Sequence, residues 1–194
     1  MDKFLEKFLI MRPFLKMISD GKFFTKIFSW FLMILACLVL IGFLYSSYKL
    51  WYALSFGFDI KLFFSNIFVE IILIALAVII MNILLIRAAD IAALPRSKDY
   101  IIIPSFVIFL KMIGEITGVF YALMGVAAGI AIWIAGAVPL SVPGFRLFFS
   151  GGGFAGGLTA VIAGPLLGFL LLCLFYFIAE QVGVLMDIAR NTKR

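Results

Sequence analysis

The sequence predicts an all-α, polytopic membrane protein with four transmembrane helices, arranged as two parallel two-helix repeats, and with additional cytoplasmic interfacial helices. The first observation behind this prediction is the composition: 65% of the 194 residues are hydrophobic and 13% are charged, against about 45–50% and about 25% in ordinary soluble domains. The mean hydropathy is +1.24. The second observation is that apolar residues form runs of membrane-spanning length, and the third is a similarity between the two halves of the chain.

Four apolar regions define the expected spans. The first runs without a charge for 22 residues between Lys26 and Lys49, and about 20 helical residues suffice to cross the hydrocarbon layer. The second is closed by Arg87 and interrupted only by Glu70 near its outer end. Glu70 could be an interfacial carboxylate or a functional intramembrane acid. We place the spans at about 27–48, 67–87, 116–138 and 157–180.

The distribution of Lys and Arg predicts the orientation. Of the 16 basic residues, twelve lie before the first span, between the second and third spans or in the C-terminal tail, and three lie in the other two loops. Because Lys and Arg concentrate on the cytoplasmic side, we expect both termini and the middle loop to be cytoplasmic. Aromatic residues typical of a membrane interface gather at the expected outer end of the first span: Tyr45, Tyr48, Trp51 and Tyr52.

Three short matches indicate an internal duplication. The pentapeptide FLKMI occurs at 14–18 and at 109–113, KLFFS at 61–65 is echoed by RLFFS at 146–150, and DIA occurs at 90–92 and 187–189. Short apolar matches also arise by chance in a chain this rich in Phe, Leu and Ile, so this alternative stays open. A duplication divides the chain into a first repeat, residues 1–95, and a second repeat, residues 96–194.

The duplication carries two structural expectations. A two-span unit returns to its starting side, so we expect parallel copies related by a pseudo-two-fold axis along the membrane normal. Since Lys16 precedes the first span, its counterpart Lys111 should precede the third. Residues 100–115 would then form a separate pre-span helix that begins near Pro104.

The N-terminal segment has the pattern of an amphipathic helix. Apolar residues recur at helical spacing on one side and charged residues occupy the rest. The segment could lie in the cytoplasmic membrane interface or pack on the cytoplasmic ends of the protein's own helices, and the pattern favours neither. The residues expected to make this contact are Phe4, Phe8, Met11, Leu15 and Ile18.

The second half resembles a domain-of-unknown-function family of small bacterial two-span membrane proteins. The resemblance rests on the motifs GGGFAGG at 151–157, GPLL at 164–167 and EQVGVLMDIARN at 180–191, and it covers roughly residues 105–192. It implies a multi-pass protein of the bacterial plasma (inner) membrane and no particular activity. The first half departs from the pattern, because it lacks the glycine-rich entry and has Ile83 where Glu180 would align.

Small residues spaced four apart predict close helix packing. They form a ridge on the fourth span, and two more glycines continue the pattern on the third. Lipid provides no hydrophobic drive for helices to associate. Small residues promote helix packing there because they allow the backbones to approach closely. The ridge could pack the fourth span on the third within one chain, or join subunits. Its members are Gly152, Gly156, Ala160, Gly164 and Gly168, with Gly125 and Gly129 on the third span.

Glu180 is the candidate intramembrane acid. An ionisable residue within a span is by default a candidate functional residue, and Glu180 lies seven residues before Asp187, about 10 Å along the helix. The alternative is an interfacial carboxylate paired with Lys111 or a neighbouring Arg. Lys111 and Glu115 stand four apart and could pair on one helix face.

The composition argues against most catalytic chemistry. The chain has no His and two Cys, which excludes imidazole metal ligands, His general bases and iron–sulfur sets. We expect no cofactor, no metal, no nucleic-acid partner and no enzymatic activity. The leading hypothesis is an integral membrane scaffold or accessory subunit that acts through helix packing in the bilayer, in a homo-oligomer or as a subunit of a membrane complex. The alternative is a channel or small transporter with a pathway between subunits.

Overall fold

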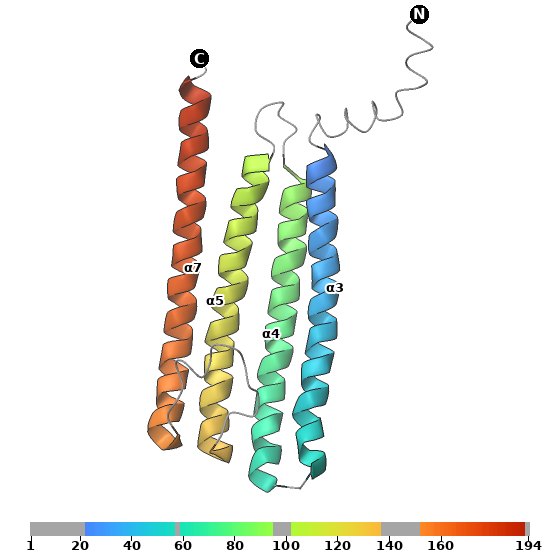
Figure 1. Ribbon diagram of the computed structural model, residues 1–194, viewed down its shortest axis with the longest axis vertical. Coiled ribbons are helices and arrows are strands. Elements are labelled where there is room, and N and C mark those ends of the chain that lie inside the picture. The colour runs from blue at the N-terminus through green and yellow to red at the C-terminus, as the bar shows by residue number, and fades with distance from the viewer. Residues whose placement is uncertain (1–21, 57–58, 95–101, 137–151, 193–194) are drawn as a thin grey trace, which may run out of the picture.

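The computed structural model describes residues 22–56, 59–94, 102–136 and 152–192, which form four long helices. They are α3 (Lys22–Tyr52), α4 (Ile60–Ala92), α5 (Ile102–Ala135) and α7 (Gly153–Thr192), and a short 3-10 helix η1 (Ala53–Phe56) follows α3 (Figure 1). Each long helix is apolar enough to cross a membrane, and the described residues contain no β-strand. The prediction of four apolar, membrane-length helices is therefore confirmed.

Local signals in the sequence set two of the helix ends. The Asp59 side chain accepts a hydrogen bond of 2.9 Å from the backbone N–H of Lys61 and caps the start of α4. At the end of α5, Gly136 adopts a φ of 75°, and its N–H donates to the Ile132 carbonyl at 2.9 Å. A left-handed conformation of this kind favours glycine, and it ends the helix.

The prediction of a separate pre-span helix at residues 100–115 is wrong. Residues 102–115 are instead the first turns of α5, which continues without a break to Ala135. Pro104 lies in the first turn, where a missing N–H has little cost. Gly114 and Gly118, farther along, are buried against α7, so their flexibility is compensated by tertiary packing and the helix does not end there.

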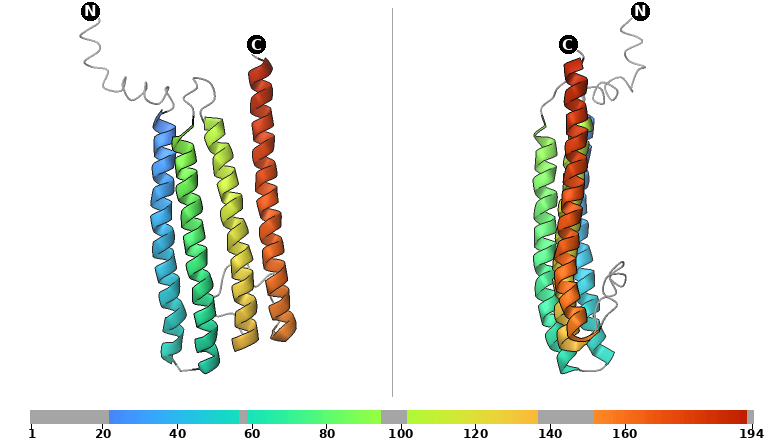
Figure 2. Two further views of the ribbon diagram at one scale, coloured as in Figure 1. Left: turned by 180° about the vertical axis from the view of Figure 1, so that it is seen from behind. Right: turned by 90° about the vertical axis from the view of Figure 1, so that its left-hand side faces the viewer.

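The four helices stand in a row in chain order. α3 packs on α4, α4 on α5 and α5 on α7, and consecutive helices run antiparallel, so the start of α3 and the end of α7 lie at the same end of the row (Figures 1 and 2). A two-fold axis relating α3 to α5 and α4 to α7 would require an α7–α3 contact equivalent to the α4–α5 contact. Those two helices are the opposite ends of the row. The sequence duplication itself stays a prediction.

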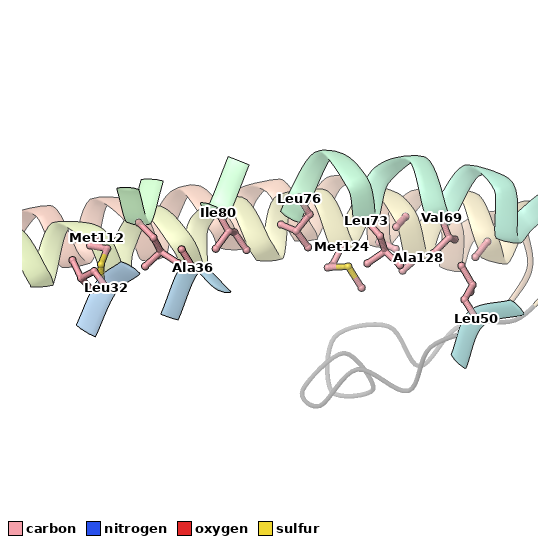
Figure 3. Packing of buried hydrophobic residues seen from close by; sticks show 14 of the residues in the cluster. Leu32, Ala36, Leu50, Val69, Leu73, Leu76, Ile80, Met112, Met124 and Ala128 are labelled. Atoms are coloured by element: carbon pink, nitrogen blue, oxygen red, sulfur yellow. The ribbon is translucent and has the colours of Figure 1, made fainter. Parts of the chain in front are cut away.

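Two kinds of packing hold the row together. A core of buried side chains joins α3, α4 and α5, including Leu32, Leu73 and Met124 (Figure 3). α7 contributes Ala160 alone to that core, because its contact with α5 is made mainly by glycines and backbone. One side of the row is thus fixed by side-chain interdigitation and the other by close backbone approach.

The expected interfacial contact of the N-terminal segment, Phe4, Phe8, Met11, Leu15 and Ile18, lies outside the described residues.

Candidate functional site

A polar cluster connects three helices toward the end of the row that carries the start of α3 and the end of α7. It consists of Arg87 on α4, Glu115 on α5 and Tyr176 on α7, and we call it the Arg87 cluster. Arg87 and Glu115 are largely buried, with 21% and 17% of their side chains exposed. The three residues are far apart in sequence, so only the antiparallel packing of α4, α5 and α7 brings them together.

The Arg87 cluster has charge-assisted geometry. The Arg87 guanidinium donates from Nε to Glu115 Oε2 at 2.9 Å and from a terminal nitrogen to Glu115 Oε1, which makes the pair bidentate. Tyr176 donates its hydroxyl hydrogen to Glu115 Oε1 at 2.5 Å. The other terminal nitrogen of Arg87 pairs with Asp90 at 2.9 Å, within the same helix. Each of the three guanidinium nitrogens of Arg87 donates to at least one acceptor, which fixes the relative rotation of the helices.

Lys111 takes a different partner from the one the sequence suggested. Its ammonium lies 5.3 Å from the centre of the Tyr176 ring, a cation–π distance, and Glu115 pairs with Arg87 instead. The ion pair that the spacing of Lys111 and Glu115 would allow is therefore not formed. The planar guanidinium matches both carboxylate oxygens, whereas lysine preceding the acid by four residues is the less favourable order on a helix.

The small-residue ridge packs within the chain. A Cβ added to Gly125 would lie 2.6 Å from the Gly164 Cα and 2.8 Å from the Ala160 carbonyl oxygen, closer than any real Cβ contact. Gly129 similarly approaches Val161, and Gly168 approaches the backbone of Gly118. The backbones of α5 and α7 therefore touch, and side chains at these positions would force the helices apart.

The ridge differs from the prediction at its ends. Gly156 is buried with the other members, but Gly152 precedes the helix and is exposed, with nothing within 4 Å of the place a Cβ would take. Sequence reasoning missed Gly114, Gly118 and Gly157, which belong to the same contact. The spacing that indicates this contact is present in the sequence, because Gly114 and Gly118 are four apart and Gly125 follows seven residues later. The helix boundary predicted at residue 115 separates Gly114 from the other two.

Glu180 stands apart from both features. Its side chain is exposed on α7, one turn beyond Tyr176, and within the described part of the chain it makes no hydrogen bond or ion pair. The expected pairing with Lys111 is wrong, because that ammonium lies over the Tyr176 ring. Among the residues that the structure describes, Glu180 has no ion-pair partner, and it lies on the outer surface of the helix row.

The geometry of the Arg87 cluster suits structural positioning. Its carboxylate is saturated by a bidentate guanidinium and a phenol, which leaves it poorly placed to accept a substrate proton. Among the residues that the structure describes, no group of three or more His, Cys, Asp and Glu side chains is placed to hold a metal ion. What the cluster supplies is a polar connection of α4, α5 and α7.

Comparison with family models, with curated proteins and with solved structures found no match for this chain. The resemblance of residues 105–192 to the two-span family stays a prediction.

Proposed function

We propose that this protein is a non-enzymatic membrane scaffold or accessory subunit that associates with a second copy of itself through the outward face of α4. In this proposal the four helices cross the bilayer with both termini in the cytoplasm. The observation that carries the proposal is Asn82, a polar side chain exposed on an otherwise apolar helix face.

The charges and aromatic residues support one placement of the membrane. On α5, Glu115 of the Arg87 cluster and Trp133 are 18 residues apart, about 27 Å of helix, close to the ~30 Å of the hydrocarbon layer. Trp133, Trp51 and Tyr48 then occupy one interface, as aromatic belts do. The Arg87 cluster lies at the other interface, on the cytoplasmic side. This placement puts Glu180 in the cytoplasmic interface.

Asn82 lies inside the hydrocarbon layer in this placement. It precedes Arg87 by five residues, about 8 Å of helix. Its amide nitrogen donates to the Val78 carbonyl at 2.8 Å, and the second N–H and the oxygen have no partner among the described residues. Since polar groups in lipid find partners across helix interfaces, the exposed amide favours a neighbouring helix at this position. The exposed residues around it are apolar: Ile71, Ile74, Val78, Leu85 and Ile86.

The face of α4 suits a second copy better than the small-residue ridge does. The ridge on α7 is covered by α5 and has no free groove for another helix. Two copies related by a two-fold axis along the membrane normal would bring the two Asn82 amides together, where each can donate to the other. A channel between subunits is the alternative, but the neighbours of Asn82 along α4 are apolar, so the face favours helix packing over a polar pathway.

The molecular mass of the purified protein in nanodiscs and in several mild detergents tests this proposal. We expect a dimer or larger oligomer for the wild type and a monomer for Asn82→Leu. Thr159→Val is the matched control, since it removes an exposed polar group from α7 and should leave the mass unchanged. A wild type that is monomeric in every medium would contradict self-association.

A further inference from the structure

α7 continues well beyond the Arg87 cluster. Its member of the cluster is Tyr176, and unbroken helix follows for 16 residues to Thr192, which is about 24 Å. The headgroup region adds only about 5–8 Å to each side of the hydrocarbon layer. In the membrane placement proposed above, on which this inference rests, the last turns of α7 stand in the cytoplasm. Figure 1 shows this end of α7 beyond the ends of the other helices. We call residues 177–192 the α7 extension.

One side of the α7 extension is apolar and exposed. Phe177, Val184 and Ile188 are 60%, 53% and 57% exposed, and no residue of α7 from Glu180 to Thr192 is buried. Lipid covers such side chains inside the hydrocarbon layer, but in the cytoplasm they contact water, which is unfavourable. A continuous apolar surface outside the membrane typically marks a site that binds another protein.

The spacing of this side indicates that the partner is a helix. Four exposed residues follow one another at intervals of four, three and four: Phe177, Gln181, Val184 and Ile188. This is the a/d pattern of a coiled coil, and we call these four residues the α7 stripe. Three half-buried residues lie on the other side of the helix: Val182, Met186 and Ala189. Since α7 packs on α5, the stripe faces away from the row.

The charges beside the α7 stripe indicate which kind of helix fits. Glu180 and Asp187 are exposed and stand seven apart, at the g positions that flank the stripe. Neither forms an ion pair with a described residue. Two copies in one membrane have the same orientation and would pair in parallel, which sets g residues beside e residues. In a second copy those e positions hold Leu185 and Thr192, which cannot neutralise a carboxylate. Basic residues on the helix of another protein can.

We propose that the α7 extension binds an amphipathic helix of a cytoplasmic partner protein, with apolar residues at its a and d positions and Lys or Arg beside them. This gives the proposed accessory subunit a contact outside the bilayer, separate from the α4 face that joins copies within it. Gln181 occupies an a position, where a polar residue specifies the register of the two helices. The contact between α5 and α7 stays in place, because the α7 stripe lies on the other side of the helix.

Alkylation of single cysteines by a membrane-impermeant maleimide tests this proposal on the full chain in phosphatidylcholine nanodiscs. Cys37 and Cys173 are first replaced by Ala. We expect Val184→Cys to react because it stands in water, and Leu170→Cys, exposed on α7 inside the hydrocarbon layer, to remain unreactive. The probe is a synthetic heptad-repeat peptide with Leu at a and d and Lys at e and g. It should slow the alkylation of Val184→Cys several-fold by covering the α7 stripe.

A matched position and a second peptide control for non-specific binding. Arg190→Cys is exposed on the same part of α7 but lies outside the stripe, so the Lys peptide should leave its rate unchanged. A peptide with Glu in place of Lys should give little protection, because Glu180 and Asp187 repel it. Asp187→Lys should weaken the protection that the Lys peptide gives to Val184→Cys.

Three results would overturn the proposal. If Val184→Cys is as unreactive as Leu170→Cys, lipid covers the stripe. If the Lys peptide does not slow a rapid reaction, or if both peptides protect equally, the stripe does not select a basic helix. A covalent dimer of Val184→Cys on mild oxidation would assign the stripe to a second copy. Adding Asn82→Leu should leave the effect of the peptide unchanged, so failure of this contact and failure of self-association through α4 are distinguishable.

Discussion

Arg87 is the residue on which the polar connection of three helices depends. Its guanidinium holds both oxygens of Glu115 and also Asp90, and Tyr176 completes the coordination of Glu115 from α7. Because Arg87 and Glu115 are mostly, but not fully, withdrawn from solvent, the pair is stronger than a surface ion pair. Removing one partner leaves the other charge partly buried, which is unfavourable.

Arg87→Leu should therefore lower the free energy of unfolding by about 1–3 kcal/mol, since a charged acceptor loses its donors. Tyr176→Phe should cost about 1 kcal/mol, since it removes one hydrogen bond. Arg190→Leu is the control, because Arg190 is exposed near the end of α7 and should change the stability by at most about 0.5 kcal/mol. Reversible unfolding in detergent measures all three. An Arg87→Leu variant as stable as the control would contradict the structural role of the cluster.

Glu180→Gln should leave both the oligomeric state and the stability close to those of the wild type. The side chain is exposed and pairs with no described residue, so a neutral amide of the same shape disturbs nothing. The measurements are the mass in mild detergent and the melting temperature in one buffer. A variant that assembles normally but loses the protein's cellular function would instead assign Glu180 an ion or proton role.

At the residue scale, the sequence indicated which charged side chains are unusual. It did not indicate which side chains contact one another. Lys111, Glu115 and Glu180 were all selected as unusual charges in apolar surroundings. Their partners depend on the register between helices, and residues four apart on one helix gave the wrong pair. From the sequence, Arg87 only marks the end of a span, since no neighbouring residue shows that α5 and α7 place a carboxylate and a phenol nearby.

At the scale of helices, the contact between α5 and α7 depends on the absence of side chains. Gly125 and Gly164 face each other with their Cα atoms in contact range, and Gly114, Gly118, Gly129 and Gly168 continue the contact along both helices. Dispersion and close packing, which supply the association energy between helices in lipid, fall off steeply when backbones separate.

Gly164→Leu should lower the free energy of unfolding strongly. Overpacking a core typically costs about 1–3 kcal/mol, and we expect a loss of at least this size. Gly183→Leu on the same helix is the control, since a Cβ at Gly183 meets nothing within 4 Å. Because the ridge packs inside the chain, we expect a lower melting temperature or poor expression of Gly164→Leu. A stable Gly164→Leu variant that runs as a discrete smaller oligomer would show that the ridge joins subunits.

The helices themselves could be predicted, because a long apolar run can form few structures other than a membrane-spanning helix. The expected spans fall inside α3, α4 and α7 and largely inside α5, which ends at Ala135. The sequence does not predict the continuity of α5, since Lys111 and Glu115 indicate a membrane interface before a new helix. Polar side chains at these positions are compatible with one continuous helix when neighbouring helices supply their partners.

At the scale of the whole molecule, the row of four helices leaves large apolar faces on α4 and α7 that no other described helix covers. The sequence predicted four apolar, membrane-length helices, and the start of α3 and the end of α7 lie at the same end of the row (Figure 1). It could not show that the row stays open, because an approximate repeat is compatible with both an open row and a closed two-fold bundle. The helix contacts decide between them: α3 and α7 are the two ends of the row.

The proposed orientation makes a topological prediction. A reporter that is active only in the cytoplasm should be active when it is fused after Arg194 or inserted near Ser97, and inactive when it is inserted near Phe56. The physical reason is the asymmetry of Lys and Arg between the two sets of loops. Activity near Phe56 would reject the orientation.

Disulfide cross-linking in native membranes tests self-association through α4 most directly. The exposed Cys37 and Cys173 are first replaced by Ala, and a single Cys is introduced by Val78→Cys, one turn from Asn82 on the same exposed face. Leu170→Cys, on the exposed face of α7, is the matched control. The proposal predicts a covalent dimer from Val78→Cys on mild oxidation, its loss when Asn82→Leu is added, and little dimer from Leu170→Cys. No dimer from Val78→Cys, or an equal yield from Leu170→Cys, would contradict it.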